Sequence, residues 1–216
     1  MDIISISWTV QVPKGDMKER FKLAIERALK AEILIFTSSA DSGKYEDKYW
    51  PSGYSPEAFI RVGAAKPDGT PAEMIGDHDK LDFFLPGVDV RLGDTPDEPD
   101  EQTSQLVRER SETGSSIATA LGAGLAAMLL YCTTIAVLTN KNKITREHLK
   151  RLHRRNDMKN AFMWIVRSKS AESDSKFVEV SQVLDNGPMN FSLSLPIDQS
   201  TTVIADWVRD LLPQSQ

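Results

Sequence analysis

The feature that most constrains the fold is a run of residues from Ile117 to Leu138 that contains no charged side chain. The run is about long enough to cross a bilayer, so one interpretation is a membrane anchor. Its many glycine and alanine residues instead suit a helix packed closely against a sheet, and its threonines make it less lipophilic than most anchors. We therefore expect a buried helix over 117–138 that does not span a membrane.

The composition is typical of a soluble globular protein. A chain of 216 residues can bury one good core, and an apolar content of 40% with a charged content of 26% is ordinary. The net charge of −5 argues against a broad nucleic-acid-binding surface. The single cysteine, Cys132, lies inside the apolar run. It is expected to be a buried, unreactive thiol rather than a nucleophile.

The chain begins with a β-branched segment over Ile3–Val10, which predicts a strand. No basic segment, apolar signal region or small-residue cleavage site precedes it, so we predict no secretory signal. The localisation is otherwise unknown, with a cytoplasmic location favoured over secretion. A chain that starts in a buried strand is expected to be a fragment of a longer parent protein with further domains.

A parallel crossover unit follows this strand. Apolar residues recur at helical spacing over Asp16–Lys30, where Asp16 and Glu19 resemble a helix-capping box. A continuous apolar strand is predicted at Ile33–Phe36, which makes a right-handed strand–helix–strand unit. Further short strands are expected over 58–62, 81–85 and 88–92. The first half of the chain therefore predicts an α/β domain with a mainly parallel sheet.

Two segments carry opposite charge. Gly93–Glu112 has seven acidic and two basic residues, a net charge of −5, and is expected to be a solvated surface loop, with a regulatory or docking insertion as the alternative. Lys143–Arg155 has six basic residues and one acidic residue. We expect an exposed helix there rather than a patch for nucleic acid or anionic lipid.

The last part of the chain predicts small elements. A short helix is expected around Met158–Ile165, and a hairpin is expected from Phe177–Val180 to Asn190–Leu195 across an Asp-Asn-Gly turn. A terminal amphipathic helix is predicted over Val203–Leu211, with Ser200 as its possible cap.

The turn that opens the apolar run, Gly114-Ser115-Ser116-Ile117-Ala118, resembles the Gly-Thr-Ser-x-Ala turn that carries the nucleophile in the subtilisin-like serine proteases. Further blocks in the family's order precede it, and together they cover about residues 2 to 138: Ile4–Trp8, Ala31–Gly43, Phe59–Ala65 and Phe84–Gly87. The acidic loop and the tail after Leu138 also resemble subtilisin-like domains of fungal multidomain proteins.

The resemblance implies a fold, an activity and a set of site residues. The fold is a subtilisin-like three-layer α/β sandwich, truncated at its N-terminus, with a peptidase domain over 1–138 and a helix and hairpin extension over 139–216. The activity is serine endopeptidase, with a polypeptide substrate, Ser116 as nucleophile and no metal or organic cofactor. The residues implied to bind the substrate are Ser7, Trp8, Ser38, Ser39 and Ala40.

The chain departs from the family in lacking a recognisable general base. The family's catalytic Asp and His lie N-terminal to every block found here. His78 is not followed by the glycine expected of the base, and His148 and His153 come after the serine. All three are expected to be surface histidines. The sequence thus has a nucleophile position but no residue to take the hydroxyl proton.

A second departure concerns Asp41. Asp41-Ser42-Gly43 superficially matches the family's aspartate signature, but its place after the first helix fits the oxyanion segment, where the family has an asparagine. An amide donates to the oxyanion, whereas a carboxylate repels it unless it is protonated. We therefore expect little or no proteolysis from this chain. The alternatives are a non-catalytic interaction module derived from a subtilase and, third, a single-span membrane protein.

Overall fold

Four parallel strands form the centre of the structure, a computed structural model that describes residues 1–43, 49–91, 111–167, 175–180 and 197–212. Their order in the sheet is β1 (Ile3–Ile6), β3 (Leu34–Ser38), β5 (Ile60–Ala65) and β6 (Phe83–Pro86). Each neighbouring pair is parallel. The predicted α/β class with a mainly parallel sheet is confirmed.

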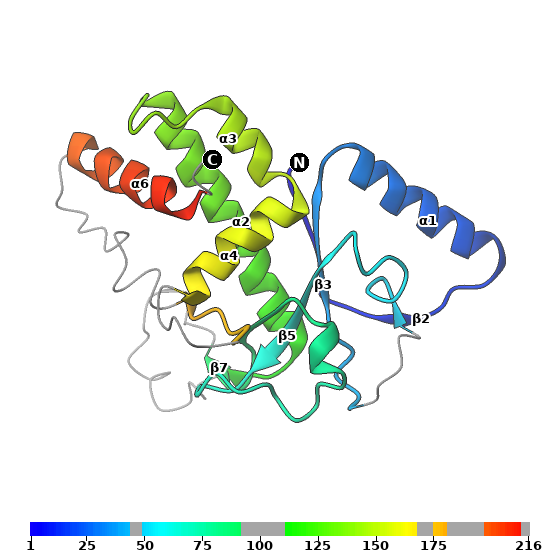
Figure 1. Cartoon of the computed structure of the whole chain (residues 1–216). Coiled ribbons are helices and arrows are strands. Elements are labelled where there is room, and N and C mark those ends of the chain that lie inside the picture. The colour runs from blue at the N-terminus through cyan, green and yellow to red at the C-terminus, as the bar shows by residue number, and fades with distance from the viewer. Residues whose placement is uncertain (44–48, 92–110, 168–174, 181–196, 213–216) are drawn as a thin grey trace, which may run out of the picture.

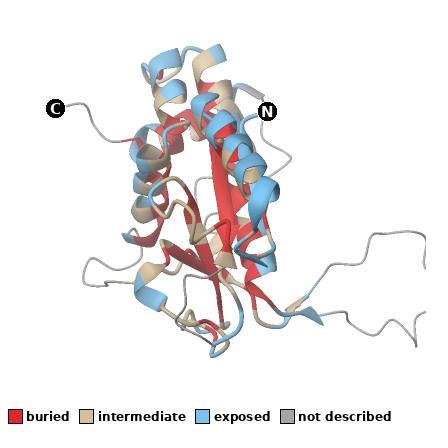
Figure 2. Cartoon of the chain, turned by 90° about the vertical axis from the view of Figure 1, so that its right-hand side faces the viewer, coloured by how far each residue is buried: buried red, intermediate tan, exposed pale blue. Residues whose placement is uncertain are grey.

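Helices cover both faces of this sheet, which gives three layers (Figure 1). One face carries α1 (Gly15–Lys30), whose Ile25 and Ala28 pack in a core with Ile6 and Ile35. The larger core lies on the other face, which is covered by α2 (Ser115–Leu138), α3 (Arg146–Leu152), α4 (Arg155–Arg167) and α6 (Ile197–Leu211). Figure 2 shows buried residues in the strands and exposed residues along the outer sides of the helices.

The apolar run is the central helix α2, as expected. Small residues let its backbone approach the sheet: a Cβ at Gly122 would meet Phe36, Val62 and Leu85 at ordinary contact distance, 3.6 Å each. By length and composition α2 is also the one helix among the described residues that could cross a membrane, and half of its most apolar window is buried. The structure thus places the helix on the sheet, and the absence of a membrane partner stays a prediction.

The two edges of the sheet differ. At the β6 edge, the Phe84 N–H donates to the Lys176 carbonyl (2.9 Å) and the Phe84 carbonyl accepts from the Val178 N–H (2.8 Å), so the chain's own residues 176–178 cover this edge. At the β1 edge no strand is paired on the outer side within the described ranges. Two small antiparallel pairs complete the strands: β2 (Val10–Gln11) with β4 (Tyr49–Trp50), and β7 (Val90–Arg91) with β8 (Ser111–Glu112).

Several predicted boundaries were wrong. The strand over Ile3–Val10 ends at Ile6, and Val10 belongs to a different sheet. The capping box at Asp16 is absent, because α1 begins at Gly15 and its N-cap Lys14 makes no side-chain cap. The basic stretch is two helices, since α3 ends at Leu152 and α4 begins at Arg155.

The C-terminal elements differ in part from the predicted ones. Ser200 is not a helix cap, because α6 begins at Ile197 and Ser200 lies within it. In the predicted hairpin, Phe177 pairs with Phe84, while residues 181–196 lie outside the described residues, as do residues 92–110 of the acidic loop. The helices after residue 138 share one core with α2, and the division into domains 1–138 and 139–216 stays a prediction.

A buried carboxylate ties α4 to the strands. Asp82 has only 6% of its side chain exposed, and it accepts from the Arg61 N–H (2.8 Å), Lys159 Nζ (2.7 Å) and Arg155 Nη2 (3.2 Å). Arg155 Nε also donates to the Phe59 carbonyl (2.6 Å). The start of α4 is thereby fixed to β5 and to the segment before β6.

Replacing this carboxylate should destabilise the protein. We expect Asp82→Asn to lower the free energy of unfolding by about 3 kcal/mol, because the surrounding cations lose their charge partner in a buried site. Urea denaturation measures this difference. The matched control is Asp210→Asn, which removes an exposed partner of Arg209 and should change stability by less than about 0.5 kcal/mol. Similar losses in the two variants would contradict the role of Asp82.

The reactivity of the single thiol, Cys132, measures how well one face of α2 is buried. Cys132 is 3% exposed, and burial raises the pKa of its thiol to about 11. Because the thiolate is the reactive form, Cys132 should resist Ellman's reagent in the folded protein at neutral pH and react fully in urea. Rapid modification of the folded chain would show that this face of α2 is accessible.

Candidate functional site

The candidate site lies where the parallel strands end at their carboxyl edge. Asp41 follows the end of β3, Gly87 follows the end of β6, and α2 begins beside both with Ser115. This edge is where α/β sheets commonly place ligands, because the strands end there and helices begin with unpaired N–H groups.

Ser115 connects the start of α2 to two strands. Its N–H donates to Asp41 Oδ2 (2.7 Å) and its hydroxyl donates to Asp41 Oδ1 (2.5 Å). The Ser115 Oγ also accepts from the Ala64 N–H of β5 (3.0 Å). Ser115 is fully buried whereas Asp41 is exposed. The carboxylate therefore caps a helix N-terminus, where both an unpaired N–H and the helix dipole favour negative charge.

Ser116 is the neighbouring residue, and it is exposed. Its Oγ lies 3.1 Å from the position that a Cβ on Gly114 would occupy, so glycine leaves the hydroxyl uncrowded. The Ile117 N–H donates back to the Gly114 carbonyl (3.1 Å), while the Ser116 N–H has no partner among the described residues. An accessible hydroxyl and a free backbone donor thus occupy the same helix end, which can attract an anion.

Gly87 holds the turn before α2 against the sheet. Its carbonyl accepts from the Gly114 N–H (2.8 Å). A Cβ at Gly87 would lie 2.6 Å from the Ala64 Cβ and 3.0 Å from the Gly114 carbonyl oxygen, distances that real structures do not tolerate without a shift. Only glycine fits here, so the turn carrying Ser116 rests directly on β5.

The residues predicted to bind substrate lie at the same edge. Ser38 is the buried last residue of β3, and the Ser39 N–H donates to the Val62 carbonyl (2.9 Å). Ala40 directly precedes Asp41, and Ser7 and Trp8 follow β1, the neighbour of β3. The structure therefore brings the predicted residues to one region of the sheet, and their contact with substrate stays a prediction.

An aromatic cluster that the sequence analysis did not predict lies next to these residues. Trp8 is half-exposed and meets Phe21 of α1 edge-on, with ring centroids 6.3 Å apart. Phe21 contacts Trp50 (5.4 Å), which contacts Tyr54 (4.6 Å). Trp8, Phe21 and the Trp50–Tyr54 pair come from three separate segments of the chain, so no local pattern could have joined them. The cluster lies beyond the carboxyl end of β1.

None of the three histidines contacts Ser116 within the described residues. His78, in the short 3-10 helix η1 (His78–Lys80), packs edge-on against Phe84 at 5.9 Å. His148 bonds to Thr145 in the capping box of α3. His153 lines a groove with Asp2, at the amino end of β1 and thus at the other end of the sheet from Ser116. The described residues contain no cluster of side chains suited to a metal.

Comparisons with known proteins agree with this fold. No protein-family model and no curated protein matches the chain. Among solved structures it is similar to the prenylagaramide maturation protease PagA, with a TM-score of 0.51 and 17% identity over 94% of this chain and 62% of that one. A lanthipeptide protease matches over 60% of this chain and 46% of that one at 20% identity, with a TM-score of 0.44. The chain thus shares its fold with a protease, and spans about 62% of that protease's length.

The two adjacent serines should behave differently when replaced. We expect Ser115→Ala to lower the free energy of unfolding by about 2 kcal/mol, because the Ala64 N–H is left buried without a partner and Asp41 loses a hydrogen bond. The control, Ser116→Ala, removes an exposed hydroxyl and should cost less than about 0.5 kcal/mol. Thermal unfolding of both variants makes the comparison. A larger loss for Ser116→Ala would contradict the geometry described above.

Proposed function

We propose that this chain carries the nucleophile segment of a subtilisin-type serine endopeptidase, in which Ser116 attacks a polypeptide substrate. The observation that supports this most is the exposed Ser116 hydroxyl beside its own free N–H, at the start of a buried central helix and at the carboxyl edge of a parallel sheet. The proposal includes no nucleic-acid or membrane partner and no metal or organic cofactor.

The chemistry assigns a role to each group. The Ser116 Oγ forms a bond to the substrate carbonyl carbon while a base removes the hydroxyl proton. The carbonyl oxygen becomes an oxyanion, and the Ser116 N–H and the α2 dipole stabilise it. The C–N bond then breaks as the base returns its proton to the leaving amine, and water releases the acyl group by the same steps.

The base must come from polypeptide other than the described residues of this chain. His78, His148 and His153 have other contacts or lie at the far end of the sheet. A histidine must lie within hydrogen-bond reach of the hydroxyl to activate it. The proposed activity therefore belongs to a longer protein or to a complex that adds a histidine next to Ser116.

A second candidate, a non-catalytic interaction module derived from such a protease, is favoured by Asp41. Its two carboxylate oxygens accept from the N–H and the hydroxyl of Ser115, so Asp41 faces α2 as an acceptor. The resemblance places Asp41 in the oxyanion hole. A carboxylate there adds negative charge at the point where the reaction also develops negative charge. Asp41 as an oxyanion-hole residue remains a proposal that requires a protonated side chain.

The isolated chain should react poorly with a fluorophosphonate probe. Phosphonylation needs an activated hydroxyl, and Ser116 has no base to activate it. Labelling should stay near that of the heat-denatured chain, and Ser116→Ala should change little of it. Strong labelling that Ser116→Ala abolishes would reveal an unsuspected base, and His78→Ala would be the first variant to identify it.

The full product of the gene decides between the two candidates. If its additional sequence holds Asp-[Ser/Thr]-Gly followed by His-Gly-[Thr/Ser], it should label at Ser116 and cleave a denatured protein such as casein, with Ser116→Ala inactive. A longer product that lacks both motifs and does not label would overturn the peptidase proposal in favour of the interaction module.

A further inference from the structure

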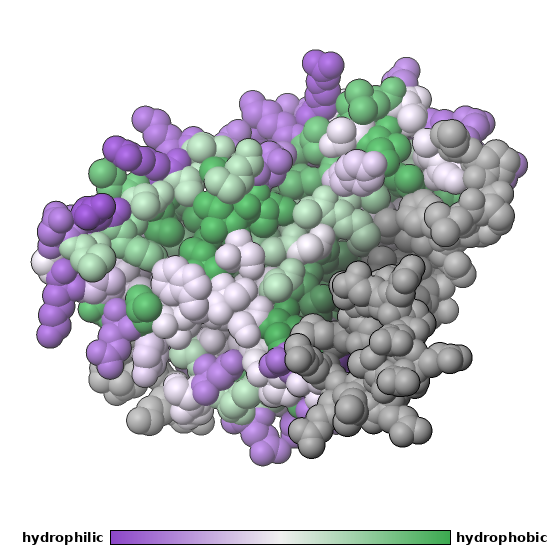
Figure 3. Space-filling view, turned by 180° about the vertical axis from the view of Figure 1, so that it is seen from behind, coloured by the Kyte–Doolittle hydropathy of each residue, from purple (hydrophilic) through white to green (hydrophobic). Residues whose placement is uncertain are grey.

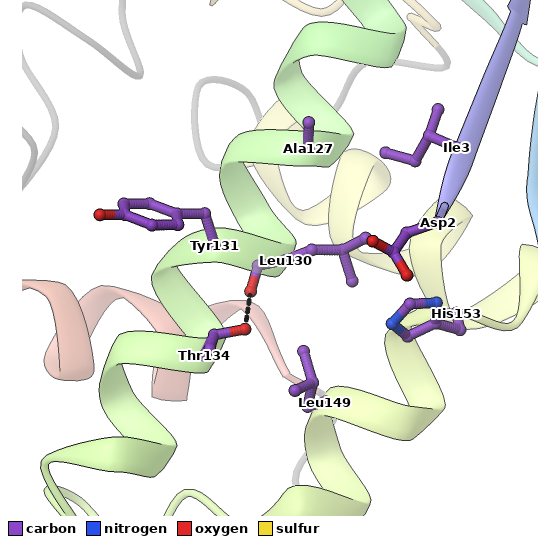
Figure 4. A pocket seen from close by; sticks show the side chains of 8 residues that line it. All are labelled: Asp2, Ile3, Ala127, Leu130, Tyr131, Thr134, Leu149 and His153. Carbon is purple, nitrogen blue, oxygen red and sulfur yellow. Dashed lines mark hydrogen bonds between the residues drawn. The ribbon is translucent and has the colours of Figure 1, made fainter.

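One edge of the sheet is covered by residues that come much later in the chain. Residues 175–180, here named the edge segment, lie along β6. The β1 edge differs: beside it a hollow of about 400 Å³ is lined by Ile3 and by Ala127 and Tyr131 of α2 (Figure 4). Figure 3, which views the molecule from behind, shows apolar surface across the middle of the molecule. The described contacts of the edge segment lead to the turn that carries Ser116.

The edge segment is fitted to β6 by its main chain and by two of its side chains. The Phe84 N–H donates to the Lys176 carbonyl, and the Val178 N–H donates to the Phe84 carbonyl. The Val178 side chain is fully buried in the larger core. The Phe177 ring lies on Gly69, since a Cβ at Gly69 would come within 2.8 Å of that ring. The middle of β6 is thus held by main-chain pairing and by packing on both sides of the pair.

The Lys176 ammonium fixes the chain just before β6. Its Nζ donates to the carbonyls of Leu81 (2.9 Å), Asp79 (3.1 Å) and His78 (3.4 Å). These carbonyls lie in η1 and in the residue that ends it. Carbonyls at a helix end lack donors from the helix itself, and a lysine side chain can satisfy them. Lys176 therefore holds the entry to β6, while its neighbours hold the middle of the strand.

The other end of β6 leads directly to the Ser116 turn. Gly87 follows the last residue of β6, and its N–H donates to the Ala65 carbonyl of β5 (3.1 Å). Its carbonyl accepts from the Gly114 N–H (2.8 Å), two residues before Ser116. The packing around Gly87 leaves no room for a Cβ. Because so close a contact cannot absorb movement, a shift of β6 is passed to Gly114 and to the start of α2.

We propose that the edge segment positions the Ser116 turn through β6, and that Lys176 is the positioning residue that anchors the segment. Lys176 does not act on substrate; it sets where β6 and Gly87 lie, and Gly87 sets where the turn lies. The candidate site then depends on residues well beyond 138, the predicted end of the peptidase domain. The identity of Ser116 as a nucleophile rests on the proposed function, whereas the positioning of its turn does not.

The test measures amide hydrogen exchange of the whole chain under native conditions. Lys176→Met removes the ammonium but keeps an unbranched side chain, and should speed exchange about tenfold at the Phe84 and Gly114 amides. Lys176→Arg keeps a cation with several donors and should restore most of the protection. The matched control is Lys141→Met, because Lys141 Nζ also donates to three oxygens, all of them on α6. This control should change exchange at the two amides by less than about twofold.

A second variant releases the edge segment without touching Lys176. Phe177→Ala removes the ring that lies on Gly69 and should also speed exchange at the Gly114 amide. Exchange at Ile35, a buried residue of β3, separates positioning from a general loss of stability and should change by less than about twofold in both variants. Circular dichroism checks that each variant folds, and Phe177→Ala still tests the segment if Lys176→Met does not fold.

Two results would overturn the proposal. One is exchange at Gly114 that stays at the wild-type rate in both Lys176→Met and Phe177→Ala. The other is an acceleration of equal size at Ile35 or in Lys141→Met, because the effect would then be a general loss of stability. None of these measurements follows Ser116 chemistry, so the positioning role and the proposed peptidase function can fail independently.

Discussion

The hydrogen bonds of Ser115 are the contact on which the candidate site depends. One buried side chain joins the first turn of α2 to the end of β3 through Asp41 and to β5 through the Ala64 N–H. Gly87 adds the support of β6 from the other side of the turn. The position of the exposed Ser116 hydroxyl is therefore set by buried contacts that Ser116 itself does not make.

The residues that hold the turn in place are not the residue that carries the candidate nucleophile. The buried serine and its carboxylate partner hold the turn, whereas the exposed serine has a free N–H at a positive helix end. A site of this kind can keep its shape without performing a reaction, because the contacts that define its geometry do not include a base. That explains why one structure is compatible with both a peptidase segment and a binding module.

The sequence predicted the existence of the main elements better than their ends or their long-range contacts. The α/β sheet, α1 and α2 follow from periodicities within one segment, as do the small residues of α2 that admit a close approach to Phe36 and Leu85. The Ser115 contacts, the Asp82 ion cluster and the Trp8–Phe21–Trp50 rings join residues that are distant in the chain. A single sequence holds no local signal for such pairs. The resemblance to subtilisin-like proteases predicted that Ser116 and Asp41 belong to one site, but it did not predict that Asp41 accepts hydrogen bonds from Ser115.

Asp82 forms ion pairs with residues that are synthesised much later than Asp82 itself. Its partners Arg155 and Lys159 follow it by 73 and 77 residues. On the ribosome, the first two-thirds of the chain emerges with this carboxylate still lacking the two cations that contact it from α4. Contacts of such wide sequence separation slow folding. The sheet can therefore gain its full stability only once α4 has been synthesised, because in a nascent chain stopped before residue 155 the Asp82 carboxylate, just before β6, lacks both of its partners from α4.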